Sequence, residues 1–120
     1  VAMEAIEELR KKKLWQQGLT KEYYTELIDI LRVFISGNWS MNALEMTTDE
    51  ILELSVIRAL DKDYSDQLTQ LLVLADLVKF AKSSPGPHDN ESAIETIKKF
   101  IERHEPTSDT DSESKVNSDV

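Results

Sequence analysis

The sequence contains no cysteine among its 120 residues, and this absence excludes several classes of site. Disulfides, zinc sites with thiolate ligands, cysteine-ligated iron–sulfur clusters and a cysteine nucleophile are all impossible. Glycine and proline are also scarce, with 3 of each. A turn-rich all-β fold, which needs these residues at many turns, is therefore disfavoured.

Basic charge and long apolar runs are also in short supply. The chain has 14 lysine and arginine residues against 23 aspartate and glutamate residues, and its formal net charge is -9. This balance argues against a nucleic-acid partner, which would require a basic face. No run of about 18 apolar residues occurs, so the sequence predicts no membrane-spanning helix within this chain.

What the sequence does contain is helical periodicity. Apolar residues recur three or four positions apart in five segments, and short polar stretches separate these segments. Thr47 and Glu50 have the pattern of a capping box, which marks a helix start. The fourth segment is apolar almost all round, which is typical of the central helix of a bundle. The expected helices are 2–17, 21–36, 47–60, a fourth from a cap at Asp63 or Ser65 to residue 82, and 91–104 after a cap at Asp89 or Asn90.

Several details of these helices can be predicted from single residues. Gly18 is the expected C-cap of the first helix. Thr20 is the expected N-cap of the second helix, and Gly37 with Asn38 is expected to end it. Residues 38–46 are irregular but carry apolar side chains, so we expect them to fold back onto the core. Phe80 is expected to face inward with the other apolar residues of the fourth helix.

These patterns predict an all-α fold, a compact bundle of about five helices with short connections and antiparallel neighbours. The bundle is expected to occupy residues 1–105. Residues 106–120 are mostly serine, aspartate and threonine, and their apolar content is too low to support a core. We expect them to form a disordered acidic tail.

One basic cluster stands out, consisting of Arg10, Lys11, Lys12 and Lys13. It could lie near anionic lipid head groups, where each charge contributes about 1 kcal/mol of binding energy. The alternative is a solvated helix face whose charges pair with nearby glutamates.

Three aromatic residues are candidates for a partner surface. Trp15, Tyr23 and Trp39 belong to residue types that dominate the energy of many interfaces. The alternative is that the tryptophans fill the core. Tyr23 and Tyr24 are adjacent on a helix, so we expect one to pack inward and the other to present its hydroxyl.

The sequence indicates no catalytic, metal or cofactor site. His88 and His104 lack further ligands at metal-binding spacing, and His104 more simply complements a helix C-terminus. No phosphate-binding glycine loop or nucleophile elbow occurs. Asp76 lies inside an apolar helix, where it could be buried and paired with Lys79. A cleft containing Asp76, Glu50 or the tyrosine pair is therefore the enzymatic alternative.

Three stretches of the sequence form a recognisable set. They are Leu-Trp-Gln-Gln-Gly at 14–18 leading into Lys-Glu-Tyr-Tyr-Thr-Glu-Leu at 21–27, Ala-Leu-Glu-Met-Thr-Thr-Asp-Glu-Ile-Leu at 43–52, and Ala-Asp-Leu-Val-Lys-Phe-Ala-Lys at 75–82. Over roughly residues 5–102 the chain resembles the C-terminal helical region of bacterial envelope proteins of the Bat (aerotolerance) type, which are common in Bacteroidetes. It departs from that family at 38–40, where Asn-Trp-Ser replaces an Arg-Phe-Gly-type turn.

The resemblance implies a plan for the whole protein. An exported N-terminal part and one transmembrane helix would precede Val1, and this domain would lie on the cytoplasmic side of the bacterial inner membrane. Its implied partners are MoxR-type AAA+ ATPases and von Willebrand factor A domain proteins, which are encoded beside family members. The basic cluster would then lie close to the bilayer.

We therefore expect a non-enzymatic protein-interaction domain of a single-pass membrane protein, without cofactor, nucleic-acid partner or small-molecule substrate. Two alternatives remain at this point. One is a helix-turn-helix regulatory module built from the third and fourth helices, and the other is a small enzyme.

Overall fold

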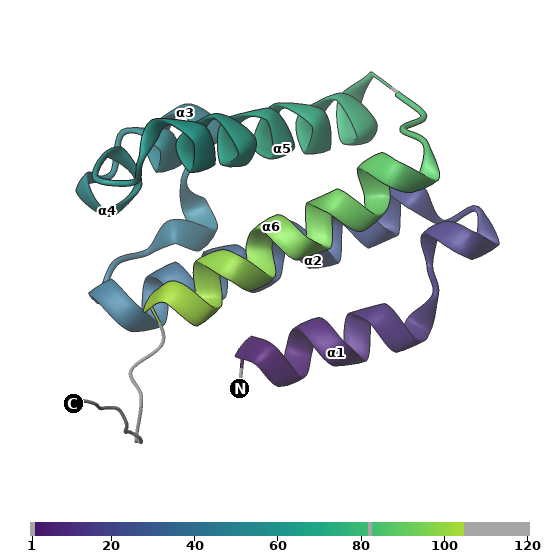
Figure 1. Cartoon of the computed structure of the whole chain (residues 1–120), viewed down its shortest axis with the longest axis horizontal. Coiled ribbons are helices and arrows are strands. Elements are labelled where there is room, and N and C mark those ends of the chain that lie inside the picture. The colour runs from purple at the N-terminus through teal and green to yellow at the C-terminus, as the bar shows by residue number, and fades with distance from the viewer. Residues whose placement is uncertain (1, 82, 105–120) are drawn as a thin grey trace.

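A computed structural model of the chain describes residues 2–81 and 83–104 (Figure 1). Within these residues the fold is a compact all-α bundle without strands, which confirms the predicted fold class. The predicted tail at 106–120 lies outside the described residues. The elements are α1 (Ala2–Lys12), η1 (Trp15–Gln17), α2 (Thr20–Trp39), η2 (Ala43–Glu45), α3 (Thr48–Leu52), α4 (Ser55–Arg58), α5 (Lys62–Phe80) and α6 (Pro87–His104), where η marks a 3-10 turn.

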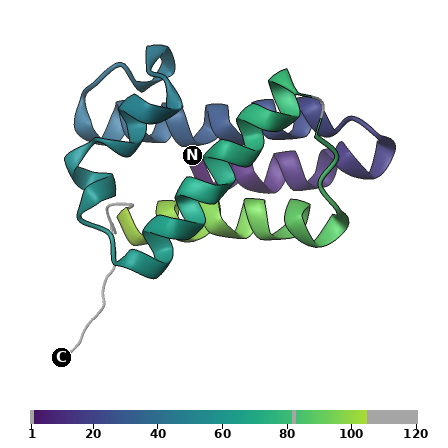
Figure 2. The same ribbon diagram turned by 90° about the horizontal axis from the view of Figure 1, so that it is seen from above.

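The central helix of the bundle is α2, which contacts each of the other long helices and both 3-10 turns. In Figure 2, α1, α2 and α6 run side by side, and α5 crosses over them at an angle. The prediction that the fourth predicted helix, now α5, is central is therefore wrong. Part of the apolar surface of α5 faces solvent, whereas α2 has contacts on several sides.

The residue pattern of α2 explains its position. Apolar and aromatic residues three or four positions apart share one side of a helix, and adjacent residues widen that side. In α2 this produces a broad buried surface, with Leu31 and Ile35 completely inaccessible. The buried residues of α2 are Tyr23, Tyr24, Leu27, Ile28, Leu31, Phe34 and Ile35.

The first helix is shorter than predicted. It ends at Lys12, and Lys13 adopts a left-handed conformation with φ 51°. The side-chain amide of Gln17 donates to the backbone oxygens of Lys12 and Lys13 at 2.7 and 3.0 Å, so the carbonyls at the break keep partners. Gly18, predicted to be a C-cap, is left-handed with φ 83° and ends the 3-10 turn η1.

The second helix is longer than predicted. It continues through Gly37 to Trp39 and ends at Ser40, which adopts a left-handed conformation with φ 52°. A glycine inside a helix costs about 1 kcal/mol relative to alanine, but packing can outweigh this cost. Trp39 provides such packing, since its ring lies edge-on to Phe34 with ring centres 6.1 Å apart.

The third predicted helix is two short helices, α3 and α4, separated at Leu54, which is extended (φ −62°, ψ 142°). Both Ile51 and Ile57 are buried. In one continuous helix, residues six positions apart point in directions that differ by about 120°. The break allows both isoleucines to reach the core.

The predicted helix caps are partly correct. The capping box is confirmed, because the hydroxyl of Thr47 accepts from the Glu50 N–H and the Glu50 carboxylate accepts from the Thr47 N–H. The other predicted caps are wrong, since α2, α5 and α6 begin earlier and contain those residues. The misassigned residues are Thr20, Asp63, Ser65, Asp89 and Asn90.

The segment between α2 and α3 folds back onto the bundle, as expected. Ala43 is buried, and the Arg32 guanidinium of α2 donates to the backbone oxygens of Ala43, at 3.1 Å, and Met46. Leu44 does not join the core and is 52% exposed. No helix in the described residues combines the length and apolar content needed to cross a membrane.

Candidate interaction surface

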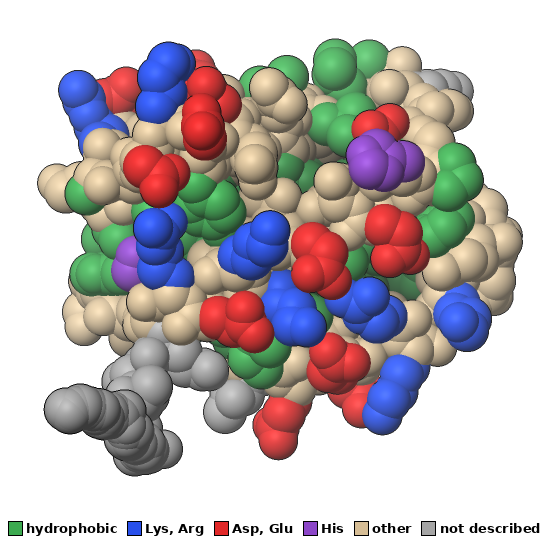
Figure 3. Space-filling view, in the orientation of Figure 1, with side chains coloured by type: hydrophobic (Ala, Val, Ile, Leu, Met, Phe, Trp, Pro, Cys, Tyr) green, Lys and Arg blue, Asp and Glu red, His purple; other side chains and the backbone are tan. Residues whose placement is uncertain are grey.

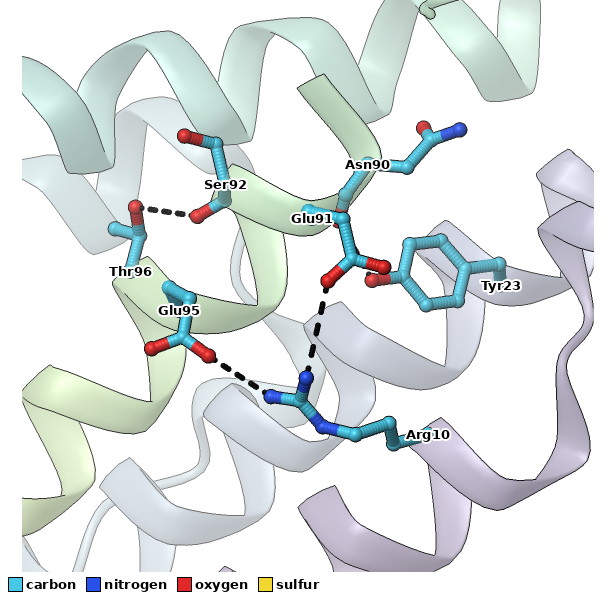
Figure 4. Close-up of polar contacts among 7 residues, drawn as sticks. All are labelled: Arg10, Tyr23, Asn90, Glu91, Ser92, Glu95 and Thr96. Carbon is cyan, nitrogen blue, oxygen red and sulfur yellow. Dashed lines mark hydrogen bonds and ion pairs between the residues drawn. The ribbon is translucent and has the colours of Figure 1, made fainter. Parts of the chain in front are cut away.

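The basic cluster begins with Arg10, whose side chain crosses from α1 to α6 (Figure 4). Its guanidinium lies 2.9 Å from the Glu95 carboxylate and 3.8 Å from that of Glu91. The hydrogen bond with Glu95 raises the pKa of Arg10 above its usual value, so the guanidinium stays charged. Arg10 therefore links two helices of the bundle.

Two of the three lysines of the cluster lie near glutamates. Lys12 lies 2.7 Å from the Glu26 carboxylate of α2, and Lys11 lies 4.0 Å from Glu8. On the face shown in Figure 3, basic and acidic side chains are interspersed over α1 and α6. These contacts agree with the interpretation of the cluster as a paired, solvated face. Proximity to a bilayer stays a prediction.

Tyr23 was a candidate for a partner surface, but it is buried, and so is Tyr24. The Tyr23 hydroxyl donates to the backbone oxygen of Asn90 at 2.7 Å, and the Tyr24 hydroxyl donates to the Asn90 side-chain oxygen at 2.8 Å. The expectation that one tyrosine presents its hydroxyl at the surface is wrong. Both rings pack because Asn90 of α6 supplies a buried acceptor for each hydroxyl.

This arrangement predicts unfolding in alkali. All 3 tyrosines of the chain are buried, and burial raises the pKa of Tyr23, Tyr24 and Tyr64 well above the usual value of about 10. Because the folded-state pKa values of the tyrosines exceed the unfolded value, the stability that their buried neutral hydroxyls contribute is complete below pH about 10. It is lost as the pH rises further. We expect tyrosinate absorbance to appear together with loss of helical circular dichroism. Ionisation at pH about 10 in a fully helical protein would contradict this.

The two tryptophans are half-buried, and both pack against the core. The Trp39 ring contacts Phe100 and His104 of α6, with ring centres 6.2 and 5.4 Å apart. Trp15 lies in η1 beside the α1–α2 connection. Each ring therefore contributes to packing and stays partly accessible, so a role in partner binding stays a prediction for both.

The residues of the enzymatic alternative take part in structural contacts. Asp76 is half-buried and accepts a hydrogen bond from the Thr48 hydroxyl at 2.8 Å, whereas Lys79 lies over the Phe80 ring. Glu50 is occupied by the capping box. In residues 2–81 and 83–104 no group of three potential metal-binding side chains is found.

A polar groove of about 250 Å³ between α5 and α6 contains His88, Asp89 and Ser92. These are the residue types of a catalytic triad, which requires each member to hydrogen-bond to the next. The Asp89 carboxylate instead accepts from the Gly86 N–H at 3.3 Å. The described residues show no hydrogen bond that joins the three side chains, so the groove has the composition of a triad without its geometry.

The regulatory alternative needs a recognition helix with basic side chains on its outer face. In this fold α5 would be that helix. Its outer face carries apolar side chains: Val73 and Leu77 are each 46% exposed, and Phe80 is 78% exposed.

The prediction that Phe80 faces the core is wrong, because positions 73, 77 and 80 lie on the opposite side of α5 from its buried residues.

Val73, Leu77 and Phe80 form what we call the α5 stripe. Their spacing of four and three residues aligns them along one face of the helix. Hydrophobic side chains gather over the C-terminal half of α5 in Figure 3. The same spacing is visible in the sequence and could have revealed a second apolar face.

A second apolar surface is the α1–α2 groove, with a volume of about 310 Å³. Val33 of α2 is 57% exposed there. Val33 was not among the predicted site residues, although a valine on the otherwise polar side of a helix indicates an apolar surface there. The groove is lined by Ala2, Ala5, Asp29, Ile30, Val33, Phe34, Gly37 and Asn38.

Comparisons of the chain with protein-family models, curated proteins and solved structures found no match.

Proposed function

We propose that this chain is a non-enzymatic protein-interaction domain. The observation that carries the proposal is the α5 stripe, which exposes three large apolar side chains along one helix face. Contiguous apolar surface of this kind is typical of binding sites in soluble domains. A partner that covers it would gain the free energy of removing these side chains from water.

The wider setting of the proposal comes from the sequence resemblance. On that basis we place the domain on the cytoplasmic side of a bacterial inner membrane, after a transmembrane helix in a longer protein. AAA+ ATPases of the MoxR type and von Willebrand factor A domain proteins are the proposed partners. The cluster Arg10–Lys13 would face the bilayer. The positive charge that its glutamate partners do not neutralise would lie near anionic lipid head groups.

Capture of these two partner types by the full-length protein tests the proposal. Replacing Val73, Leu77 and Phe80 together by serine is expected to reduce capture at least about tenfold, since the apolar contact surface is lost. Leu44→Ser is the matched control, because it removes a similarly exposed leucine from η2.

Two further results complete this test. Deleting residues 1–105 from the full-length protein should abolish capture. Equal capture by the wild type, the serine variant and the deletion would overturn the proposal.

A further inference from the structure

The α1–α2 groove has features that folding alone does not explain. Gly37 lies inside α2 with an ordinary helical backbone, and nothing lies within 4 Å of the position that a Cβ would occupy. Alanine would therefore fit and would favour the helix. The missing side chain instead leaves space at the surface, where another backbone can approach closely.

The groove is apolar over most of its length and flanked by small residues. Val33 and Gly37 are four positions apart, so they share one side of α2. Ala2 and Ala5 of α1 form the facing wall. Small side chains line both walls of the groove, so the backbone of a docking element can approach closely.

Charge indicates what could occupy this groove. Among the described residues that line the groove, Asp29 is the one ionisable residue, and it is exposed. Within residues 2–81 and 83–104, Asp29 forms no ion pair. A second copy of the chain would bring another net charge of -9, and residues 105–120 contain five acidic residues and one lysine. Electrostatic repulsion disfavours both occupants and favours a cationic one.

We propose that the α1–α2 groove binds an amphipathic helix of a partner protein, which places an apolar ridge on Val33 and Gly37 and a lysine or arginine beside Asp29. The inference rests on the proposed interaction function and specifies the chemistry of one partner. A helix is the fitting element because the described residues offer no strand edge for an extended peptide. Polyproline segments need a groove lined by several aromatic rings, whereas Phe34 is the single aromatic residue here.

The test uses the full chain and two labelled synthetic peptides of about 18 residues, or roughly five helical turns. Both peptides have the same leucine and alanine ridge, flanked by lysine in one and by glutamate in the other. Fluorescence anisotropy should show that the lysine peptide binds at least about tenfold more tightly. Asp29→Lys should reverse this preference.

Two variants separate groove binding from general attraction to an acidic protein. Gly37→Leu leaves the charge unchanged and fills the groove, so it should weaken lysine-peptide binding at least about tenfold. It should also raise the melting temperature, because leucine favours a helix over glycine. Leu44→Asp, on η2 and outside both apolar surfaces, should leave binding by the lysine peptide essentially unchanged.

Several results would overturn the inference. They are equal binding of both peptides, undiminished binding to the Gly37→Leu variant, or a dimer in sedimentation that Gly37→Leu dissociates, which would identify a second copy as the occupant. Partner capture through the α5 stripe is measured separately. Retained capture with failed peptide binding would therefore reject the groove and leave the proposed function standing.

Discussion

Replacing Leu31 by alanine is expected to lower the free energy of unfolding by about 2–5 kcal/mol. Leu31 is completely buried at the middle of α2, and truncation would leave a cavity where the central helix meets its neighbours. Leu77→Ala makes the same chemical change on α5 at a side chain that is 46% exposed. For Leu77→Ala we expect a change within about 0.5 kcal/mol.

Urea denaturation followed by circular dichroism measures both variants. The comparison is informative because sequence periodicity alone assigned the central position to the helix that carries Leu77. A larger loss of stability from Leu77→Ala than from Leu31→Ala would contradict the placement of α2 at the centre of the bundle.

A second large effect is expected at Asn90. This side chain is 3% exposed and accepts the hydrogen bond from the Tyr24 hydroxyl, which is itself completely buried. Asn90→Ala leaves that hydroxyl without its acceptor, and a buried unsatisfied donor costs about 1–3 kcal/mol. We expect a loss of stability in this range, although alanine is the better helix former.

A double-mutant cycle isolates the contribution of this hydrogen bond. Tyr24→Phe removes the donor, and the double variant removes both partners. We expect the double variant to lose less stability than the sum of the single changes, with a coupling energy of about 0.5–3 kcal/mol. Strict additivity in the denaturation data would show that Asn90 and Tyr24 do not interact in solution.

The features that could be predicted from the sequence are those that depend on local patterns. Apolar residues at helical spacing predicted the helices, and the capping box at Thr47 and Glu50 follows from side-chain hydrogen bonds within one turn. The left-handed cap at Gly18 is local in the same sense. In each case the residues that determine the structure are close together in the chain.

The features that were missed depend on contacts between distant parts of the chain. The continuation of α2 through Gly37 goes with the packing of Trp39 against Phe100 and His104 of α6, which outweighs local preference. Asn90 looks like a cap in the sequence, but its partners lie more than 60 residues earlier.

The candidate surface was predicted poorly for a related reason. Periodicity identifies apolar positions on α5, but it does not decide which of two apolar faces meets the core. Phe80 was therefore assigned to the interior, and Val33 was not considered. Tyr23 was assigned to the surface because a buried acceptor for its hydroxyl cannot be seen in the sequence.

The central claim is that the apolar side chains of the α5 stripe lie outside the core and are available to bind a partner. The most direct measurement is the free energy of unfolding of the isolated chain with Val73, Leu77 and Phe80 replaced by serine. The structure predicts a loss of no more than about 1 kcal/mol, because exposed substitutions cost little. A loss of about 4 kcal/mol or more, as expected for core truncations, would contradict the claim.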